Sequence, residues 1–186
     1  MRRPKLFRAR KGDGKQSGGR SAVFLHEACR CYRREWRERA LSPPGTSDFQ
    51  HEVELVVAFS GGGSNIPADK VEELIFGYAV GLDMTRRDIQ AAAKKKGRPW
   101  DMSKAFDFSA PCAAITPKAE TGALVKGAIA CKVNGKLRQS ADLSDMTWKV
   151  PQIVQFLSAL VEIRPGGSHL HGDARRRRAG RARRHD

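Results

Sequence analysis

The sequence predicts an α+β fold that is mainly β, and three features support this prediction. Two apolar segments, residues 52–59 and 76–82, have the length and composition of buried strands. The pair Asn134-Gly135 joins two extended segments, which is typical of a β-hairpin. The helical patterns are short and lie between the extended segments.

In the first half of the central region, strands and helices alternate. The strand over residues 52–59 is followed by the glycine-rich stretch 60–64, which predicts a turn. Pro67 suits the first position of a helix, which we expect to run to about Leu74. The strand over residues 76–82 then ends at Asp83.

The second half begins with a predicted helix over residues 86–96, which has cationic residues in its last turn and Gly97 beyond it. We expect residues 104–114 to be extended and residues 129–139 to form the hairpin. The last helix, residues 151–161, is amphipathic. Its apolar side contains Ile153, Val154, Leu157, Leu160 and Val161.

The net charge of +15 is concentrated at the two ends of the chain. Residues 1–42 contain 13 Lys and Arg against 4 Asp and Glu, a net of +9, and residues 167–186 contain 7 against 2, a net of +5. The middle, residues 43–166, is close to neutral at +1. This balance argues against a fold that binds nucleic acid specifically, because such folds display a basic face.

These boundaries divide the chain into three parts. We expect residues 1–42 to be a basic disordered segment, residues 43–166 to be the folded domain, and residues 167–186 to be an Arg-rich disordered tail. No apolar run approaches the roughly 20 residues of a membrane span, so no membrane partner is expected. The cysteines have no zinc-site spacing and predict reduced thiols in a cytoplasmic protein. They are Cys29, Cys31, Cys112 and Cys131.

Three carboxylates in the middle of the chain indicate a metal site. Glu52 and Glu54 are two residues apart on a predicted strand, so they share one face, and Asp83 ends the next strand. Apolar neighbours mean that these acids need a charged partner or a metal, and oxygen ligands favour Mg²⁺ or Mn²⁺ over zinc. A solvated strand face and a strand-end cap are the alternatives. His51 alternates to the opposite face and is expected to be structural.

Four long stretches between residues 43 and 166 resemble the fumarylacetoacetate hydrolase family, especially its small bacterial fumarylpyruvate and acylpyruvate hydrolases. They are PPGTSDFQHEVELVVA, NIPADKVEELIFGYAVGLDMTRRDIQ, KKKGRPWDMSKAFDFSAPCAAITP and VNGKLRQSADLSDMTWKVPQIVQFLSALVEIRPG. The resemblance implies the family's mixed β-sandwich roll and a homodimer. It identifies the folded domain as a catalytic domain, although an incomplete one.

The resemblance also implies an activity and a site. The expected reaction is cleavage of a C–C bond in an acylpyruvate, such as fumarylpyruvate or a related 1,3-diketo acid of aromatic-compound degradation, to pyruvate and a carboxylic acid. The expected cofactor is Mg²⁺ or Mn²⁺. The implied metal ligands are Glu52, Glu54 and Asp83. The implied active-site lysine is Lys104, and the implied substrate-binding residues are Arg87 and Gln90.

Both ends of the chain depart from the family pattern. The family's N-terminal Gly-Arg-Asn-Tyr segment, with the His and Glu that supply a water-activating base, is absent as written. Its C-terminal Gly-Thr-Pro-x-Gly-Val-Gly loop is absent too. Suitable codons for residues 1–14 and 167–180, read one base later, yield both motifs, so we interpret both ends as frameshifted. A chain made as printed is therefore expected to be poorly stable and to have little or no activity.

Two other functions remain open. A keto-acid decarboxylase or an isomerase or hydratase of the same family would share the carboxylate site, so Glu52, Glu54 and Asp83 do not separate these activities. A non-enzymatic protein that binds polyanions through its basic ends is the alternative from a different class. Its support is the charge of +15 alone.

Overall fold

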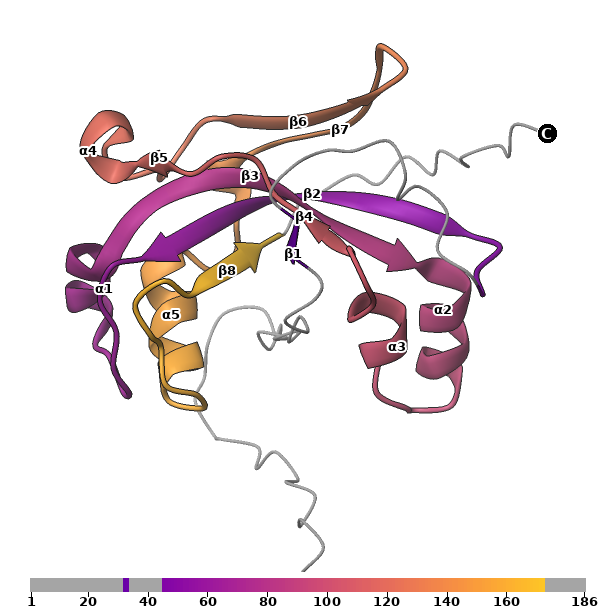
Figure 1. Cartoon of the computed structure of the whole chain (residues 1–186), viewed down its shortest axis with the longest axis horizontal. Coiled ribbons are helices and arrows are strands. Elements are labelled where there is room, and N and C mark those ends of the chain that lie inside the picture. The colour runs from indigo at the N-terminus through magenta and orange to yellow at the C-terminus, as the bar shows by residue number, and fades with distance from the viewer. Residues whose placement is uncertain (1–31, 34–44, 173–186) are drawn as a thin grey trace, which may run out of the picture.

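A curved antiparallel sheet of four strands forms the centre of the protein (Figure 1). The computed structural model describes residues 32–33 and 45–172. In order across the sheet, the strands are β5 (Thr116–Pro117), β3 (Ile75–Arg86), β2 (Phe49–Phe59) and β8 (Ser168–His171). The fold is α+β with more strand than helix, as the sequence predicts.

The long central strands β2 and β3 pair along their whole length. Alternation divides β2 between two faces, and Val53, Leu55 and Val57 all point into the main core. On the same core face lie α1 (Ala68–Leu74) and α5 (Val150–Ser158), which supply Val71 and Val154. The opposite face of β2 carries the two glutamates and a second, smaller apolar cluster, which contains Val56, Ala79 and Cys112.

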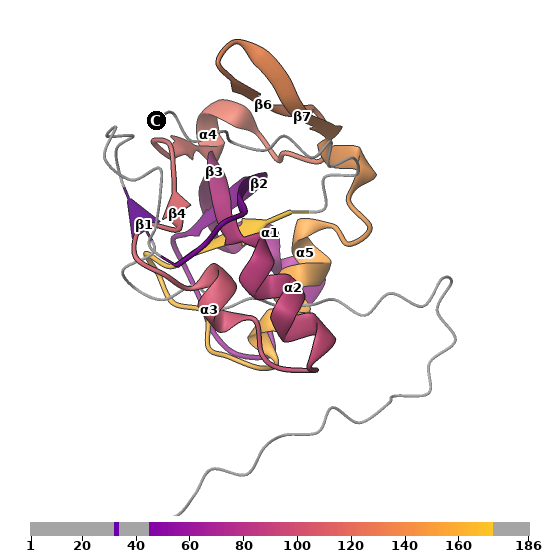
Figure 2. The same cartoon turned by 90° about the vertical axis from the view of Figure 1, so that its right-hand side faces the viewer.

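The β-hairpin of β6 (Ala128–Val133) and β7 (Lys136–Asp142) crosses over the central sheet and projects away from it (Figures 1 and 2). Asn134 and Gly135 have φ of 51° and 74°, the left-handed pair that a tight hairpin turn requires. The hairpin is anchored by Gln139, whose side-chain oxygen accepts a hydrogen bond of 2.7 Å from the Val53 amide.

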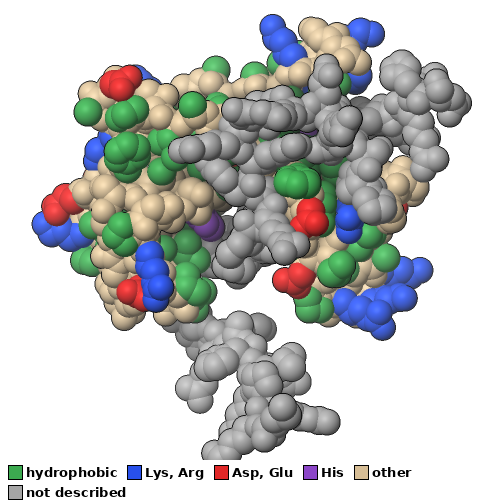
Figure 3. All heavy atoms as spheres, viewed as in Figure 1, with side chains coloured by type: hydrophobic (Ala, Val, Ile, Leu, Met, Phe, Trp, Pro, Cys, Tyr) green, Lys and Arg blue, Asp and Glu red, His purple; other side chains and the backbone are tan. Residues whose placement is uncertain are grey.

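Two helices lie beside the end of the sheet that is remote from α1 and α5 (Figure 1). They are α2 (Arg87–Lys95), which continues directly from β3, and α3 (Asp101–Lys104). Lys94, Lys95 and Lys96 are exposed at the end of α2, where basic side chains gather at the lower right of Figure 3. The C-terminal end of α2 is therefore solvated.

The remaining elements are short. They are β1 (Tyr32–Arg33), which pairs in parallel with β4 (Ala110–Pro111), the helix α4 (Lys118–Thr121) and a 3-10 turn over Leu143–Asp145. No helix in the described part of the chain is both long enough and apolar enough to span a membrane.

Several sequence predictions are confirmed. The strand over 52–59, the helix from 67 to 74, the helix over 86–96 and the hairpin are all present, with boundaries that differ by a few residues. The strand predicted to end at Asp83 instead continues to Arg86, because β2 extends to Phe49 and pairs with it.

Three other predictions were wrong. Lys104 lies in α3 rather than in an extended segment, because residues 101–104 form a helical turn. Leu160 and Val161 are exposed, since α5 ends at Ser158 and the turn that follows carries them away from the core. Order was expected to stop at Gly167, but β8 follows and pairs with Leu55–Ala58 of β2. The predictions for residues 1–31, 34–42 and 173–186 lie outside the described residues.

Candidate metal and active site

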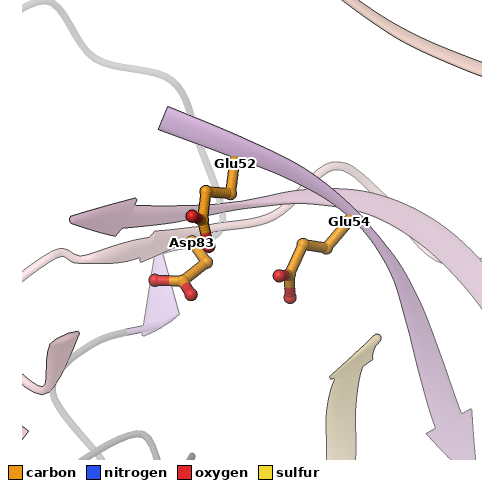
Figure 4. Close-up of side chains that lie close together, drawn as sticks. All are labelled: Glu52, Glu54 and Asp83. Atoms are coloured by element: carbon orange, nitrogen blue, oxygen red, sulfur yellow. The ribbon is translucent and has the colours of Figure 1, made fainter. Parts of the chain in front are cut away.

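Three carboxylates meet where β2 and β3 lie side by side. Glu52 is directly opposite Asp83 in the register, and Glu54 is opposite Gly81. Figure 4 shows the three side chains projecting to the same side of the two strands. One oxygen of each carboxylate lies within 4.8 Å of the others. The structure therefore brings together all three predicted metal ligands.

The local sequence explains this convergence. Period-two alternation sends Val53 and Leu55 into the core, so Glu52 and Glu54 must face the other way. The paired register then brings Asp83 to the same face, since directly opposite residues of an antiparallel pair share a face. Asp83 is only 4% exposed and Glu52 is partly buried, so a charge of opposite sign is needed nearby.

Lys104 supplies such a charge. Its side chain is 2% exposed, and its ammonium donates to Glu52 Oε2 at 2.8 Å, to Asp83 Oδ2 and to Thr85 Oγ1 at 2.7 Å. Lys104 is the last residue of α3, and its side chain reaches residues of β2 and β3, which lie much earlier in the sequence. A buried ammonium is stable only when its donors are used, and here all three donors have acceptors.

Arg87 forms the second positive side of the cluster. Its guanidinium contacts Glu52 Oε1 at 2.5 Å and donates to Gln90 Oε1 at 2.7 Å and to Gln50 Oε1 at 3.2 Å. Arg87 and Gln90, both predicted to bind substrate, therefore lie together beside the acids. Their role toward a substrate stays a prediction; in this structure Arg87 contacts Glu52, and Gln90 contacts Arg87.

The beginning of α2 is tied to the loop before β2 through Asp88. Its carboxylate accepts hydrogen bonds from the Thr46 hydroxyl at 2.6 Å, from the Ser47 amide and hydroxyl at 2.8 and 3.0 Å, and from the Ile89 amide at 2.9 Å. Burial opposes ionisation of Asp88, but these hydrogen bonds outweigh it and lower its pKa to about 2. This latch fixes the start of α2, where Arg87 lies.

His51 lies outside the cluster. Alternation places it on the face of β2 that carries Val53, and it lies near Arg138 of the hairpin. Burial is the largest cause of its lowered pKa, the Arg138 charge lowers the pKa further, and the Glu52 charge acts in the opposite direction. Alternation predicts this position correctly, and the structural role of His51 stays a prediction.

Sequence reasoning missed two members of the site, Thr85 and Gln50. Thr85 is two residues beyond Asp83, and the alternation rule used for Glu52 and Glu54 would have placed it on the same face if the strand had been extended. Gln50 is two residues before Glu52 and directly opposite Thr85 in the register, so the same rule would have placed it on this face if the first strand had also been extended. Only its contact with Arg87, 37 positions away, had no local signal.

The donor set fits a hard divalent cation. Oxygens bound to Mg²⁺ or Mn²⁺ at about 2.1 Å lie roughly 3–4 Å from one another, so carboxylates already within 4.8 Å need only small movements. Lys104 contacts Glu52 and Asp83, and Arg87 contacts Glu52, so part of the negative charge of the cluster is balanced by these side chains. Carboxylate oxygens are nevertheless the ligand type that hard divalent cations prefer.

The chain matches a known family over most of its length. The family described as "Fumarylacetoacetate (FAA) hydrolase C-terminal" matches residues 33–168, a range that begins earlier than the domain start predicted at residue 43. The match includes the acid cluster, Lys104 and Arg87.

Individual relatives agree with this match. A fumarylpyruvate hydrolase from a Ralstonia species is 44% identical over 125 residues, which are 67% of this chain and 64% of that protein. The human mitochondrial oxaloacetate tautomerase is 36% identical over 132 residues, 71% of this chain and 60% of that protein.

Among solved structures, the fumarylpyruvate hydrolase from Pseudomonas aeruginosa in complex with Mn²⁺ and pyruvate superposes with a TM-score of 0.67. It is 43% identical to this chain, and the match covers 68% of this chain and 55% of that one. The chain therefore spans less than two thirds of the length of these relatives.

Proposed function

The chain belongs to the fumarylacetoacetate hydrolase family, and from this membership we propose that it is a metal-dependent hydrolase of acylpyruvates. The proposed reaction cleaves the C–C bond of a 1,3-diketo acid, such as fumarylpyruvate, to pyruvate and a carboxylic acid. We propose Mn²⁺ or Mg²⁺ as the cofactor and a cytoplasmic homodimer as the working form.

One observation supports this proposal most directly: a cluster of three carboxylates in direct contact with a buried ammonium. Glu52 and Asp83 both contact Lys104. A cluster of this kind can take a hard cation and also leaves a fixed positive charge beside it. A relative 43% identical was crystallised with Mn²⁺ and pyruvate, which is the product proposed here.

The atoms and electrons of the proposed hydrolysis balance as follows from its bond changes. Water adds to the acyl carbonyl carbon, and the bond from that carbon to the methylene group breaks. The electron pair of this bond passes to the pyruvate part as an enolate, which gains a proton at carbon to become pyruvate. A cation held by Glu52, Glu54 and Asp83 would act as a Lewis acid that polarises the substrate's carbonyl groups.

The chain's own residues contribute positioning and charge. The Lys104 ammonium is fixed beside the cluster and can stabilise negative charge that develops on the enolate oxygen. Arg87 holds Glu52 through its guanidinium, and Gln90 in turn holds Arg87. We propose that Arg87 and Gln90 also face the substrate's carboxylate.

A related activity is the second candidate. The human oxaloacetate tautomerase at 36% identity acts on a keto acid, and the same cluster would serve tautomerisation or decarboxylation. These reactions also pass negative charge to an enolate oxygen, so Lys104 would have the same role in them. The two candidate activities differ in their substrates, whereas the carboxylate cluster is compatible with both.

The test measures products from a panel of keto acids with Mn²⁺ present. Pyruvate release from fumarylpyruvate and other acylpyruvates supports the hydrolase, whereas CO₂ release or enol–keto conversion of oxaloacetate alone supports the second candidate. The assay is run on the chain as printed and on its frame-corrected form. We expect turnover in the corrected form and little in the printed one. If neither form takes up Mn²⁺, the proposal is contradicted.

A further inference from the structure

We propose that Thr85 is a positioning residue that keeps the Lys104 ammonium beside the acid cluster when a divalent cation binds there. The inference rests on the proposed function, since it takes Glu52, Glu54 and Asp83 as the cation site. It deepens that function by giving a task to a residue outside the ligand set.

Thr85 is built into the site as a fixed hydrogen-bond acceptor. It lies on β3 two residues after Asp83, on the same face, and it is 0% exposed. Its hydroxyl donates to the Asp83 carbonyl oxygen at 3.4 Å and accepts from Lys104 Nζ at 2.7 Å. A hydroxyl oxygen has two lone pairs, so the Thr85 hydroxyl can accept from the ammonium while its proton is donated elsewhere.

The three acceptors of Lys104 differ in what a cation does to them. An ammonium has three N–H donors, and Lys104 directs one to Glu52, one to Asp83 and one to Thr85. Glu52 and Asp83 are also proposed cation ligands, so their oxygens serve two positive groups. Thr85 is neutral and is not a member of the carboxylate cluster.

Cation binding therefore weakens two of the three attachments and leaves the third. A divalent charge at the cluster repels the ammonium and competes for the carboxylate oxygens. The bond to the Thr85 hydroxyl is not competed for, and it becomes the main attachment that prevents Lys104 from moving away. Lys104 needs to stay in order to stabilise negative charge on the substrate.

The experiment follows the position of Lys104 directly. The 186-residue chain is treated briefly with an amine-acylating reagent, with and without saturating Mn²⁺, and acylation of each lysine is quantified by peptide mass spectrometry. Thr85→Val removes the hydroxyl at similar volume, and Thr85→Ser keeps the hydroxyl without the methyl group. Lys136, on the exposed hairpin, is the internal control.

With Mn²⁺ bound, we expect Lys104 in Thr85→Val to be acylated about tenfold faster than in the wild-type protein, whereas Thr85→Ser stays protected. Without Mn²⁺, Lys104 should be protected in all three proteins, because both carboxylates then hold it. Lys136 should be labelled at one rate throughout. Thermal melts check folding, and Thr85→Ala replaces Thr85→Val if the latter does not fold.

Two results would overturn the inference alone: wild-type labelling of Lys104 in Mn²⁺-loaded Thr85→Val, or equal labelling of the Ser and Val variants. Calorimetry on the wild-type protein separates the inference from the proposed function. If neither that protein nor its frame-corrected form takes up Mn²⁺, the cation site itself is wrong and the proposed function falls with the inference.

Discussion

The acid cluster and the β6–β7 hairpin are both built on paired antiparallel strands, yet different forces determine them. In the cluster, charged side chains are buried against partners that come from distant parts of the sequence, and Lys104 meets Glu52 across 52 positions. In the hairpin, Asn134 and Gly135 set the turn locally, and side chains such as Leu137 are 59% exposed. Substitutions should therefore be costly in the first region and mild in the second.

This contrast has an energetic reason. Removing one partner from a buried ion pair leaves the other charge without compensation, which costs several kcal/mol. An exposed side chain on a hairpin is already solvated, so its removal changes little.

The largest effect concerns cation binding. Asp83→Ala removes a carboxylate that is 4% exposed and opposite Glu52, so Mn²⁺ affinity should fall by about 100-fold or more. Titration calorimetry measures this. Leu137→Ala in the hairpin is the matched control and should bind Mn²⁺ like the wild-type protein. Equal affinity in both variants would show that the cluster is not the cation site.

Substituting a glycine of β3 and a glycine of the hairpin tests the contrast through the free energy of unfolding. A Cβ at Gly77 would lie 2.2 Å from the Thr116 carbonyl oxygen, and that contact is with backbone, so Gly77→Ala should lower the free energy of unfolding by about 2–4 kcal/mol. Gly135 has a φ of +74° and open space around it, so Gly135→Ala should cost about 1 kcal/mol. Urea unfolding measures both, and a larger loss at Gly135 would contradict the expected order.

The Asp88 latch should give a stability difference that depends on pH. The pKa of Asp88 is lowered in the folded protein to about 2, so its ionised form stabilises the fold above the unfolded-state value near 3.8. Asp88→Asn should therefore lose about 1–2 kcal/mol at pH 7, an amount reduced by partial solvation. The difference from the wild-type protein should shrink as pH falls from 4 to 2. A difference that is constant over this range would show that ionisation of Asp88 is not the cause.

The smallest effect is expected at the hairpin surface. Leu137→Ala should change the free energy of unfolding by less than about 0.5 kcal/mol, since the side chain is 59% exposed. Thermal unfolding of the two proteins tests this directly. A loss above 1 kcal/mol would mean that the hairpin's outer face is covered in solution and that the contrast between the two regions is smaller than the structure indicates.

Much of the fold was predictable because local patterns determine it. Alternation in β2 identified the buried and charged faces, and the Asn134-Gly135 turn located the hairpin. The extension of β3 beyond Asp83 and the pairing of β8 were not predictable in this way. Both depend on which strand lies alongside β2, and no local pattern contains that information.

The carboxylates of the site were predictable for the same reason, and their charged partners Lys104 and Arg87 were identified through family resemblance alone. Lys104 was expected in an extended segment and lies in a helical turn, yet its ammonium still reaches the cluster. Thr85 and Gln50 had no assigned role, although both contact residues of the site.

The sequence by itself determined which side chains share a strand face, where the tight turn lies and which acids face away from the core. These properties depend on patterns that are only two to four residues long. Only the tertiary structure decided that Lys104, Thr85 and Arg87 surround those acids. The physical reason is that a buried charge requires partners of opposite charge or hydrogen-bonding groups at specific distances. Contacts between residues far apart in the chain create that arrangement.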